Sequence, residues 1–144
     1  MIDLHIHTNC SDGTLTPKEV IDEALKNNVK ILAIADHDTI DAYTSDLFNY
    51  ASSKGIQIIP AVEISTKYNK VGIHILGYNI DINNKELKDT LYNIRNSRHK
   101  YLQDVSIKLK ELGYIINIEN LSKIESVTKA HIANDIITNK ENEL

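Results

Sequence analysis

The first residues alternate between apolar and polar positions, and this alternation predicts a β-strand over 2–6. The segment 31–35 is almost continuously apolar, which is typical of a parallel strand covered on both faces. Two further apolar runs, 56–59 and 72–80, predict a third and a fourth strand. The strands are short and lie close together along the chain.

Helical patterns separate these strands. Thr16, Pro17 and Glu19 predict a helix start, because Thr caps a first turn, Pro suits the first helical position and Glu completes a capping box. Thr39 is expected to cap a second helix that ends before Gly55. The order strand, helix, strand, helix, strand predicts an α/β fold of right-handed βαβ units with a parallel sheet or barrel.

The second half of the chain is expected to be mainly helical. Apolar residues recur at helical spacing from about 84 to 112, and Arg98 occupies one position on that apolar stripe. An arginine that faces the protein body needs an anionic partner, either a substrate phosphate or a structural carboxylate. Residues 114–118 are predicted to form a short strand and 131–137 a final helix.

Composition adds a few constraints. The 144 residues are 42% hydrophobic, enough for one ordinary core. The net charge of −4 argues against a broad nucleic-acid-binding surface. A single cysteine allows no internal disulfide and favours the cytoplasm. No signal peptide or membrane span is expected, because a strand follows Met1 directly and no apolar run approaches about 20 residues.

Histidines and carboxylates occur where the predicted strands end. His5 and His7 lie on one face of the first strand, about 7 Å apart at Cα, where they either share a metal ion or serve as structural residues. Asp12 follows in a Ser-Asp-Gly segment, which by itself indicates a turn. His37 follows the second strand with an aspartate on each side, as suits a metal ligand with supporting groups.

Two more candidates come from the next strands. Glu63 follows the third strand closely, and burying a lone carboxylate is costly unless a cation meets it. His74 lies between two isoleucines and by itself indicates a core histidine. In barrel-like α/β folds the strand ends form the rim where sites are built. The joint pattern therefore predicts a metal centre made of His5, His7, Asp12, His37, Glu63 and His74.

Five short motifs carry a family resemblance: DLHIHT at 3–8, SDG at 11–13, ADHDT at 35–39, PAVEIS at 60–65 and HILGY at 74–78. Together they resemble the PHP superfamily, the polymerase and histidinol phosphatase group of metallophosphoesterases. The similarity covers essentially the whole chain and is nearest to the nucleoside 3′,5′-bisphosphate phosphatase and 5′-to-3′ exoribonuclease branch.

The resemblance implies the N-terminal part of a distorted (β/α)7, TIM-like barrel with a helical insertion. Residues 1–82 would form the barrel portion with the metal ligands, and residues 83–144 the mainly helical insertion. The family's later motifs, a further histidine and a terminal Asp-x-His pair, are missing, and such a barrel usually takes about 200 residues or more. We therefore expect a truncated barrel with incomplete metal occupancy, weak or absent activity and an open sheet edge that favours self-association.

The same resemblance implies a cluster of Mn²⁺, Fe²⁺ or Zn²⁺ ions, each of which suits carboxylates beside imidazoles. A metal-activated hydroxide would attack phosphorus in line. The family pattern distributes the six ligands over three ions: His5 and His7 on one, Glu63 bridging it to a second that His74 also holds, and Asp12 and His37 on a third.

The implied substrate is a phosphorylated small molecule, a nucleotide such as a 3′,5′-bisphosphate, or the 5′ end of a short RNA. Asp36 and Asp38 are the candidates for orienting ligands or relaying protons. Arg98 and His131 are the candidate substrate-binding residues. His131 ends a Lys-Ala-His segment where this branch has Arg-Pro-His, a replacement that weakens the case for a phosphate contact from Lys129.

Three other functions fit the same residues less closely: a histidinol-phosphatase-like enzyme, an amidohydrolase-like metallohydrolase and a metal-binding fragment without turnover. An amidohydrolase has no place for the SDG and ADHDT motifs. Lys67 is expected to be plain surface.

Overall fold

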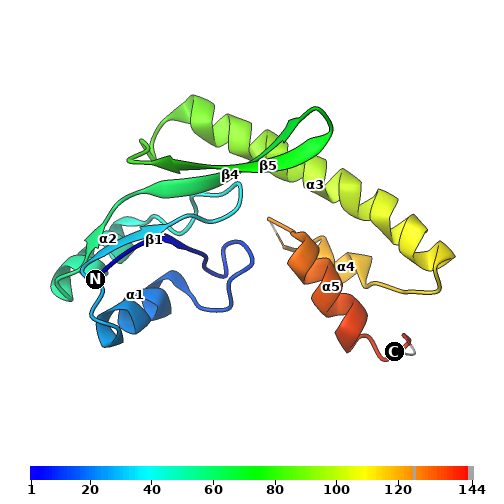
Figure 1. Ribbon diagram of the computed structural model, residues 1–144, viewed down its shortest axis with the longest axis horizontal. Coiled ribbons are helices and arrows are strands. Elements are labelled where there is room, and N and C mark those ends of the chain that lie inside the picture. Colours follow the sequence, from blue (N-terminus) through cyan, green and yellow to red (C-terminus); the bar gives the residue numbers. More distant parts are fainter. Residues whose placement is uncertain (125, 143–144) are drawn as a thin grey trace.

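A parallel sheet forms the first part of the computed structural model, which describes residues 1–124 and 126–142. Its strands β1 (Ile2–Ile6), β2 (Ile31–Ile34) and β3 (Gln57–Ile58) lie in the order β1-β2-β3 (Figure 1). The three strands predicted from the apolar runs up to residue 59 are therefore present, although β3 is only two residues long.

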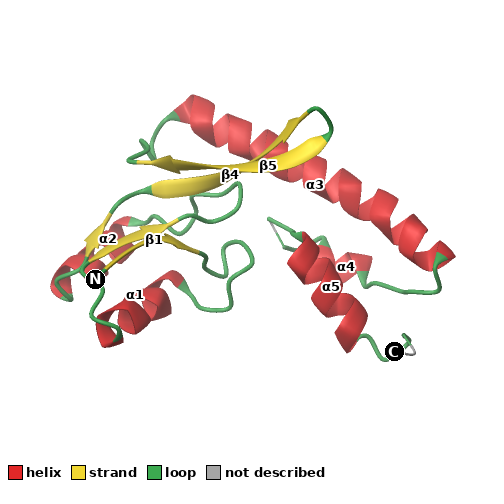
Figure 2. Ribbon diagram, viewed as in Figure 1, coloured by secondary structure: helices red, strands yellow, loops and turns green. Residues whose placement is uncertain are grey.

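Helices α1 (Pro17–Lys26) and α2 (Ser45–Ser53) connect these strands (Figure 2). The predicted capping box of α1 is confirmed, with Thr16 as N-cap. The prediction that Thr39 caps the second helix is wrong, because Thr44 is the N-cap of α2. The hydroxyl of Thr39 instead donates a hydrogen bond to a carboxylate two residues later, which stabilises a turn ahead of the helix.

An antiparallel hairpin follows, and its second strand covers most of the strand predicted over 72–80. Strands β4 (Ala61–Tyr68) and β5 (Val71–Tyr78) pair along their whole length. Only Asn69 and Lys70 connect them, and strands joined by two residues must run antiparallel. The start of β4 still lies parallel to the end of β2, since His37 bridges to Glu63. The start of the β4–β5 hairpin thus lies beside the segment that follows β2.

The second half is helical, as predicted, with α3 (Lys85–Glu111), α4 (Ile118–Leu121) and α5 (Lys129–Thr138). The strand predicted over 114–118 is wrong. Backbone amides of this segment donate to side chains near the C-terminus: Ile115 to Asn142 and Asn117 to Asp135, both at 2.7 Å. These side chains satisfy the backbone, so the segment needs no neighbouring strand.

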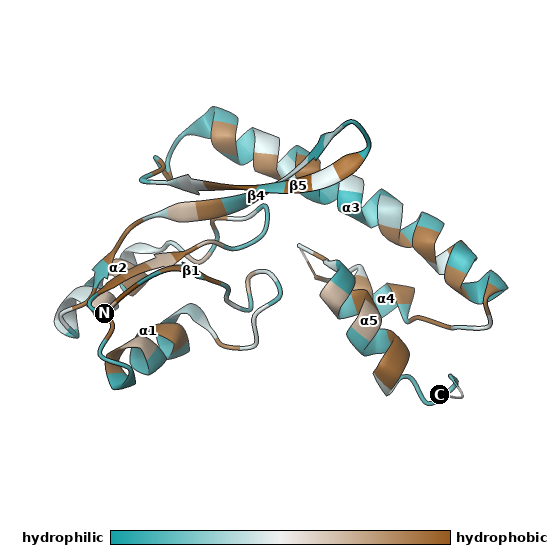
Figure 3. Cartoon of the chain, in the orientation of Figure 1, coloured by the Kyte–Doolittle hydropathy of each residue, from teal (hydrophilic) through white to brown (hydrophobic). Residues whose placement is uncertain are grey.

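Among the described residues, two large hydrophobic cores and one small cluster around Ala33 hold these elements together. Ile21, Leu32 and Leu47 are central to the first core, which also includes Leu91 from the N-terminal half of α3. The second core packs Leu102 of α3 against α4 and α5. Figure 3 shows apolar residues recurring along α3, which links the two cores. None of the helices in the described ranges combines the length and apolar character that crossing a bilayer requires.

Candidate metal centre

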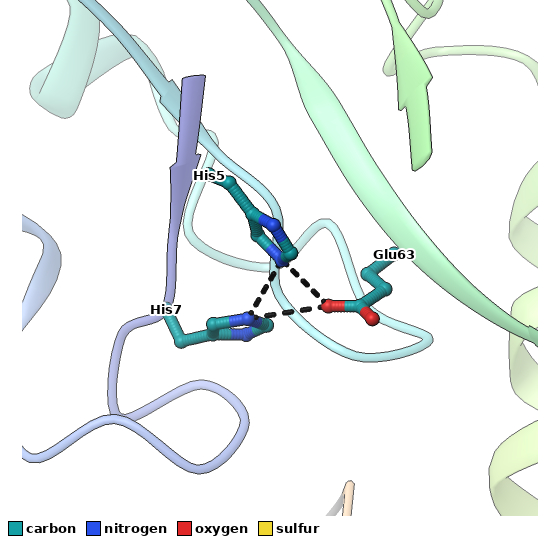
Figure 4. Close-up of side chains that lie close together, drawn as sticks. All are labelled: His5, His7 and Glu63. Atoms are coloured by element: carbon teal, nitrogen blue, oxygen red, sulfur yellow. Dashed lines mark hydrogen bonds and ion pairs between the residues drawn. The ribbon is translucent and has the colours of Figure 1, made fainter. Parts of the chain in front are cut away.

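The side chains of His5 in β1, His7 directly after it and Glu63 in β4 meet at one point (Figure 4). The Nε2 atoms of His5 and His7 lie 3.2 Å apart, and Oε2 of Glu63 lies 2.8 Å from the first and 3.2 Å from the second. Zinc and similar ions bind such atoms at about 2.1 Å, which separates neighbouring ligand atoms by roughly 3 Å. The triangle therefore has the dimensions of one face of a metal coordination shell.

The two carboxylate oxygens of Glu63 face different partners. Oε2 faces His5 and His7, whereas Oε1 lies 2.7 Å from Nδ1 of His74. Glu63 is only 7% exposed. Burial by itself raises the pKa of its carboxyl, but hydrogen bonds from His5 and His74 outweigh burial and lower the pKa. The group is thus held as a carboxylate with one oxygen available on each side.

A third group contains His7, Asp12 and His37. Asp12 lies between the two rings, 3.5 Å from Nδ1 of His7 and 3.6 Å from Nε2 of His37. Burial lowers the pKa of His37 and favours its neutral form, in which a ring nitrogen lone pair can bind a metal. Within the described residues, Nδ1 of His37 is the buried side-chain polar atom that lacks a hydrogen-bond partner. This unsatisfied imidazole nitrogen lies 3.7 Å from Oε2 of Glu63, a pair of donor atoms that suits a cation.

The six predicted ligands therefore come together in three overlapping groups of His, Asp and Glu side chains. Imidazoles and carboxylates suit Mn²⁺, Fe²⁺ and Zn²⁺. The chemistry of the donor set thus fits a divalent metal centre, while the role of each residue as a ligand stays a prediction.

Asp36 supports the loop that carries Asp12. Its carboxylate accepts hydrogen bonds from the backbone and the hydroxyl of Thr8 and from the hydroxyl of Ser11, at 2.6–2.7 Å. Burial raises the pKa of Asp36, and these hydrogen bonds oppose the rise. The three bonds occupy the carboxylate, so the structure places Asp36 as a support for the loop.

Asp38 has a comparable position on the other side of the site. Its carboxylate accepts from the backbone of Ser65 at 2.7 Å and pairs with the guanidinium of Arg98. Arg98 also donates to the hydroxyl of Ser65 and to the carbonyl of Val127. A guanidinium has five N–H donors, so these bonds leave little of Arg98 free to bind a phosphate. The predicted inward orientation is confirmed, and the partner observed is a carboxylate.

A cleft of about 660 Å³ lies beside these residues. One part of its wall carries Asp12, His37 and His74, and α3 contributes Arg98 to the lining. Lys67, which was expected to be plain surface, also lines the cleft. The remaining lining residues come from the β4–β5 hairpin, from α3 and from the start of α5.

His131 lies next to the cleft, between the lining residues Ala130 and Ile132, but does not line it. Its Nδ1 accepts a hydrogen bond from the backbone of Thr128 at 3.0 Å. This bond leaves Nε2 as the protonated nitrogen of the neutral ring. Burial lowers the pKa of His131, and the charges of Asp12 and Arg98 act on it in opposite directions. The ring is therefore close enough to the centre to respond to its charge.

The sequence of the chain is similar to those of known proteins. The chain is 34% identical over 137 residues to a 5′-3′ exoribonuclease of Haemophilus influenzae, covering 94% of this chain and 50% of the relative. It is 35% identical over 112 residues to a 3′,5′-nucleoside bisphosphate phosphatase of Chromobacterium violaceum, covering 78% and 39%. The chain thus spans about half the length of the relatives that it matches.

Solved structures agree with this similarity. An amidohydrolase from Chromobacterium violaceum, solved with bound sulfate and no metal, superposes with a TM-score of 0.86 at 29% identity, covering 96% of this chain and 50% of that protein. A putative metal-dependent phosphoesterase from Bifidobacterium adolescentis gives 0.79 at 25% identity, covering 94% and 49%. The PHP domain family pattern matches residues 3–141. The chain therefore belongs to the PHP domain family.

Proposed function

We propose that this chain provides the metal centre of a metal-dependent phosphoesterase that acts on a nucleotide, such as a 3′,5′-bisphosphate, or on the 5′ end of an RNA. The observation that carries the proposal is the position of Glu63. Its carboxylate lies between His5 and His7 on one side and His74 on the other, and the cleft begins at the same place.

The cleft chemistry supports a phosphate ester as the substrate. Divalent ions at these residues would supply a hydroxide nucleophile at neutral pH and neutralise charge on the phosphate. The side chains that line the cleft beyond the candidate ligands include Lys67 and Lys70, both cationic. Cations beside a divalent centre favour an anionic ligand over a neutral amide. The relatives named as an exoribonuclease and a bisphosphate phosphatase support the same choice.

The residues of the chain have separable tasks in this proposal. Glu63 orients the imidazoles of β1 and β5 toward a shared centre. Asp36 fixes the loop that presents Asp12, and Asp38 fixes the guanidinium of Arg98 at the cleft wall. Both aspartates act through their neighbours, so their removal should change the geometry of the site rather than remove a reacting group.

Phosphate release tests the proposal. The full chain would be incubated with Mn²⁺ and with adenosine 3′,5′-bisphosphate, a 5′-phosphorylated oligoribonucleotide, histidinol phosphate or a dihydropyrimidine. We expect weak Mn²⁺-dependent turnover of the first two substrates, abolished in Glu63→Gln and retained in Glu86→Gln, which changes an exposed glutamate on α3. Preferential turnover of histidinol phosphate or the dihydropyrimidine would overturn the substrate assignment. Unchanged metal binding in Glu63→Gln would overturn the metal centre.

A further inference from the structure

The hydrogen-bond ladder between β2 and the segment that leads into β4 is interrupted at one position. Its three backbone bonds run from Gln57 to Lys30, from Ile59 to Leu32 and from Glu63 to Asp36, at 2.9, 2.8 and 3.2 Å. This register predicts a further bond from the amide of Ala61 to the carbonyl of Ile34. The described structure places the hydroxyl of Tyr43 there instead. The amide of Ala61 donates to that hydroxyl at 2.8 Å, and the hydroxyl donates to the carbonyl of Ile34.

The inserted hydroxyl coincides with the point where the two sheets separate. Strand β3 ends at Ile58 and pairs with β2, whereas β4 begins at Ala61 and pairs with β5 in a second sheet. Two hydrogen bonds in series span a wider gap than a single bond of about 2.9 Å, so the hydroxyl holds the two backbones apart. The backbones meet again where His37 bridges to Glu63. The insertion therefore lies directly before two candidate metal ligands.

The surroundings of this hydroxyl are closed to bulk water. Ile34 and Ala61 are fully buried, and Tyr43 is 8% exposed. Without the hydroxyl, the amide of Ala61 and the carbonyl of Ile34 would either lack partners or bond to each other directly. Burial raises the pKa of Tyr43, so its hydroxyl keeps the proton that it donates to Ile34. The carbonyl of Ile59 is a more distant acceptor, at 3.4 Å.

The position of the hydroxyl is fixed from outside the two strands. Tyr43 lies in the turn that precedes α2, and its backbone amide donates to the carbonyl of Ile40 at 3.0 Å. Its ring stacks on that of Phe48 in α2, with the centroids 5.9 Å apart and the planes inclined by 20°. Leu47 holds α2 in the first core. The hydroxyl is thus presented by α2 as a spacer of fixed position between β2 and β4.

The width of this gap affects which ligand atoms can share an ion. Nδ1 of His37 lies 3.7 Å from Oε2 of Glu63. The rings of His37 and His74 lie 4.9 Å apart at their centroids, and His74 is on the strand paired with β4. A direct bond from Ala61 to Ile34 would draw β4 toward β2 and move Glu63 and His74 with it. Metal ligands have to stay within about 0.5 Å of their working positions, so such a shift would disturb binding.

We propose that Tyr43 is a positioning residue whose hydroxyl, inserted between β2 and β4, sets the separation of His37 from Glu63 and His74 in the metal centre. The inference rests on the proposed function and deepens it. Tyr43 lies outside the five sequence motifs that carry the family resemblance. Metal binding would thus depend on a hydroxyl that is not part of the ligand set.

Zn²⁺ calorimetry and the visible absorption of bound Co²⁺ test this role on the full chain without turnover. The test variant is Tyr43→Phe, which removes the hydroxyl and keeps the ring. Tyr50→Phe is the matched control, because it removes a hydroxyl that joins α2 to Asp22 of α1. Val20→Ala is a second control, because it should destabilise the same core without changing either strand.

His74→Ala identifies the ion concerned, because His74 belongs only to the candidate group with His37 and Glu63. We expect Tyr43→Phe to weaken binding of that ion by about tenfold or more, as for other groups that hold a metal ligand in place. The Co²⁺ absorption should change too, because it depends on the arrangement of ligands around the ion. Both controls should bind Zn²⁺ within about twofold of the wild type and keep its Co²⁺ spectrum.

The proposal would be overturned if Tyr43→Phe were less stable in urea but bound Zn²⁺ and Co²⁺ as the two controls do. The hydroxyl would then have a structural role alone. If Tyr43→Phe unfolds in buffer, the same comparison would be made for every variant in trimethylamine N-oxide, which favours folded chains because it is excluded from their surface.

These outcomes are separate from the fate of the proposed function. Absence of Mn²⁺-dependent hydrolysis in the wild type, with the effect of Tyr43→Phe on metal binding preserved, would overturn the enzyme assignment alone. Hydrolysis by the wild type, with unchanged metal binding in Tyr43→Phe, would overturn the positioning role alone.

Discussion

The carboxylate of Asp38, which is fully buried, is paired with the guanidinium of Arg98 sixty residues further along the chain. The pair joins the loop after β2 to α3, and Arg98 extends the link to the carbonyl of Val127 ahead of α5. One ion pair thus connects the strands that carry the candidate ligands to the helices that form the other wall of the cleft.

Removing one partner of this pair should destabilise the fold. Arg98→Met leaves the Asp38 carboxylate buried without its cation, which costs about 3–5 kcal/mol in comparable cases. Urea denaturation should show this loss. Asp38→Asn combined with Arg98→Met should cost less than Arg98→Met alone, because no unpaired charge remains, and Asn tolerates the positive φ of 53° at this position.

Lys85→Met provides the control for this experiment. It removes the cation of an exposed ion pair with Asp89, and such pairs contribute about 0–1 kcal/mol. If Arg98→Met lowers the free energy of unfolding no more than Lys85→Met does, the Asp38–Arg98 pair does not hold α3 to the loop after β2.

Metal binding should involve fewer than three tightly held ions per chain. The three candidate groups share His7, His37 and Glu63, and an imidazole normally supplies one nitrogen to one ion. Calorimetric titration with Mn²⁺ or Zn²⁺ would count the ions. His74→Ala should lower the stoichiometry or the affinity of one ion, with little loss of stability because the side chain is 50% exposed.

The control for this titration is His99→Ala, since His99 lies on α3 and belongs to none of the candidate groups. Three tight ions in the wild-type chain would contradict the prediction. So would identical titrations of the wild type and His74→Ala.

Local signals explain which elements could be predicted from the sequence. The capping box at Thr16 and the apolar periodicity of α3 depend on residues close together in the chain, and both predictions are confirmed. Strand β4 was missed because alternate residues such as Ser65 and Lys67 are polar and face the cleft. The turn at Asn69 and Lys70 also lacks the Gly that usually signals a two-residue hairpin.

The residues of the site could be predicted from the sequence, but the contacts that hold them in place could not. Strand ends and family motifs selected all the side chains that meet around Glu63. The partner of Asp38 could not be found in the same way, because its contact with Arg98 depends on how α3 packs across the strands. The position of Lys67 at the cleft could not be predicted either, because an isolated lysine in a sequence is most often a solvated surface residue.

The metal-free chain should become less stable as the pH falls below about 6.5. Burial lowers the pKa of both His37 and His131 in the folded state. Below the ordinary histidine pKa of about 6.5, the unfolded chain therefore binds more protons than the folded chain. The free energy of unfolding falls as the pH drops from about 6.5 to the lowered pKa values of the two histidines in the folded state. Urea denaturation in EDTA at pH 7.5 and 5.5 would measure the difference.

His131→Gln should reduce this pH dependence. Glutamine can keep the hydrogen bond from the backbone of Thr128, as in an ordinary capping box, but it does not titrate. His99→Gln removes a histidine elsewhere on the chain and should keep the wild-type dependence. An unchanged difference between the two pH values in His131→Gln would show that its buried ring does not contribute.

Gly13→Ala should destabilise the loop that presents Asp12. A Cβ at this position would lie 2.4 Å from the carbonyl oxygen of His7 and 2.9 Å from the carbonyl carbon of Thr8. Both are backbone atoms, and the loop is closed by a hydrogen bond from the Gly13 amide to the carbonyl of Thr8. The backbone must therefore shift, at a cost of about 1–3 kcal/mol by analogy with overpacked cores.

Gly72→Ala is the matched control, because a Cβ there meets no atom within 4 Å. Urea denaturation should show a loss for Gly13→Ala and little change for Gly72→Ala. Because His7 and Asp12 flank the affected turn, Gly13→Ala should also weaken Mn²⁺ binding in the calorimetric titration. Wild-type stability and metal affinity in Gly13→Ala would mean that the close approach of the loop to His7 is not required for the site.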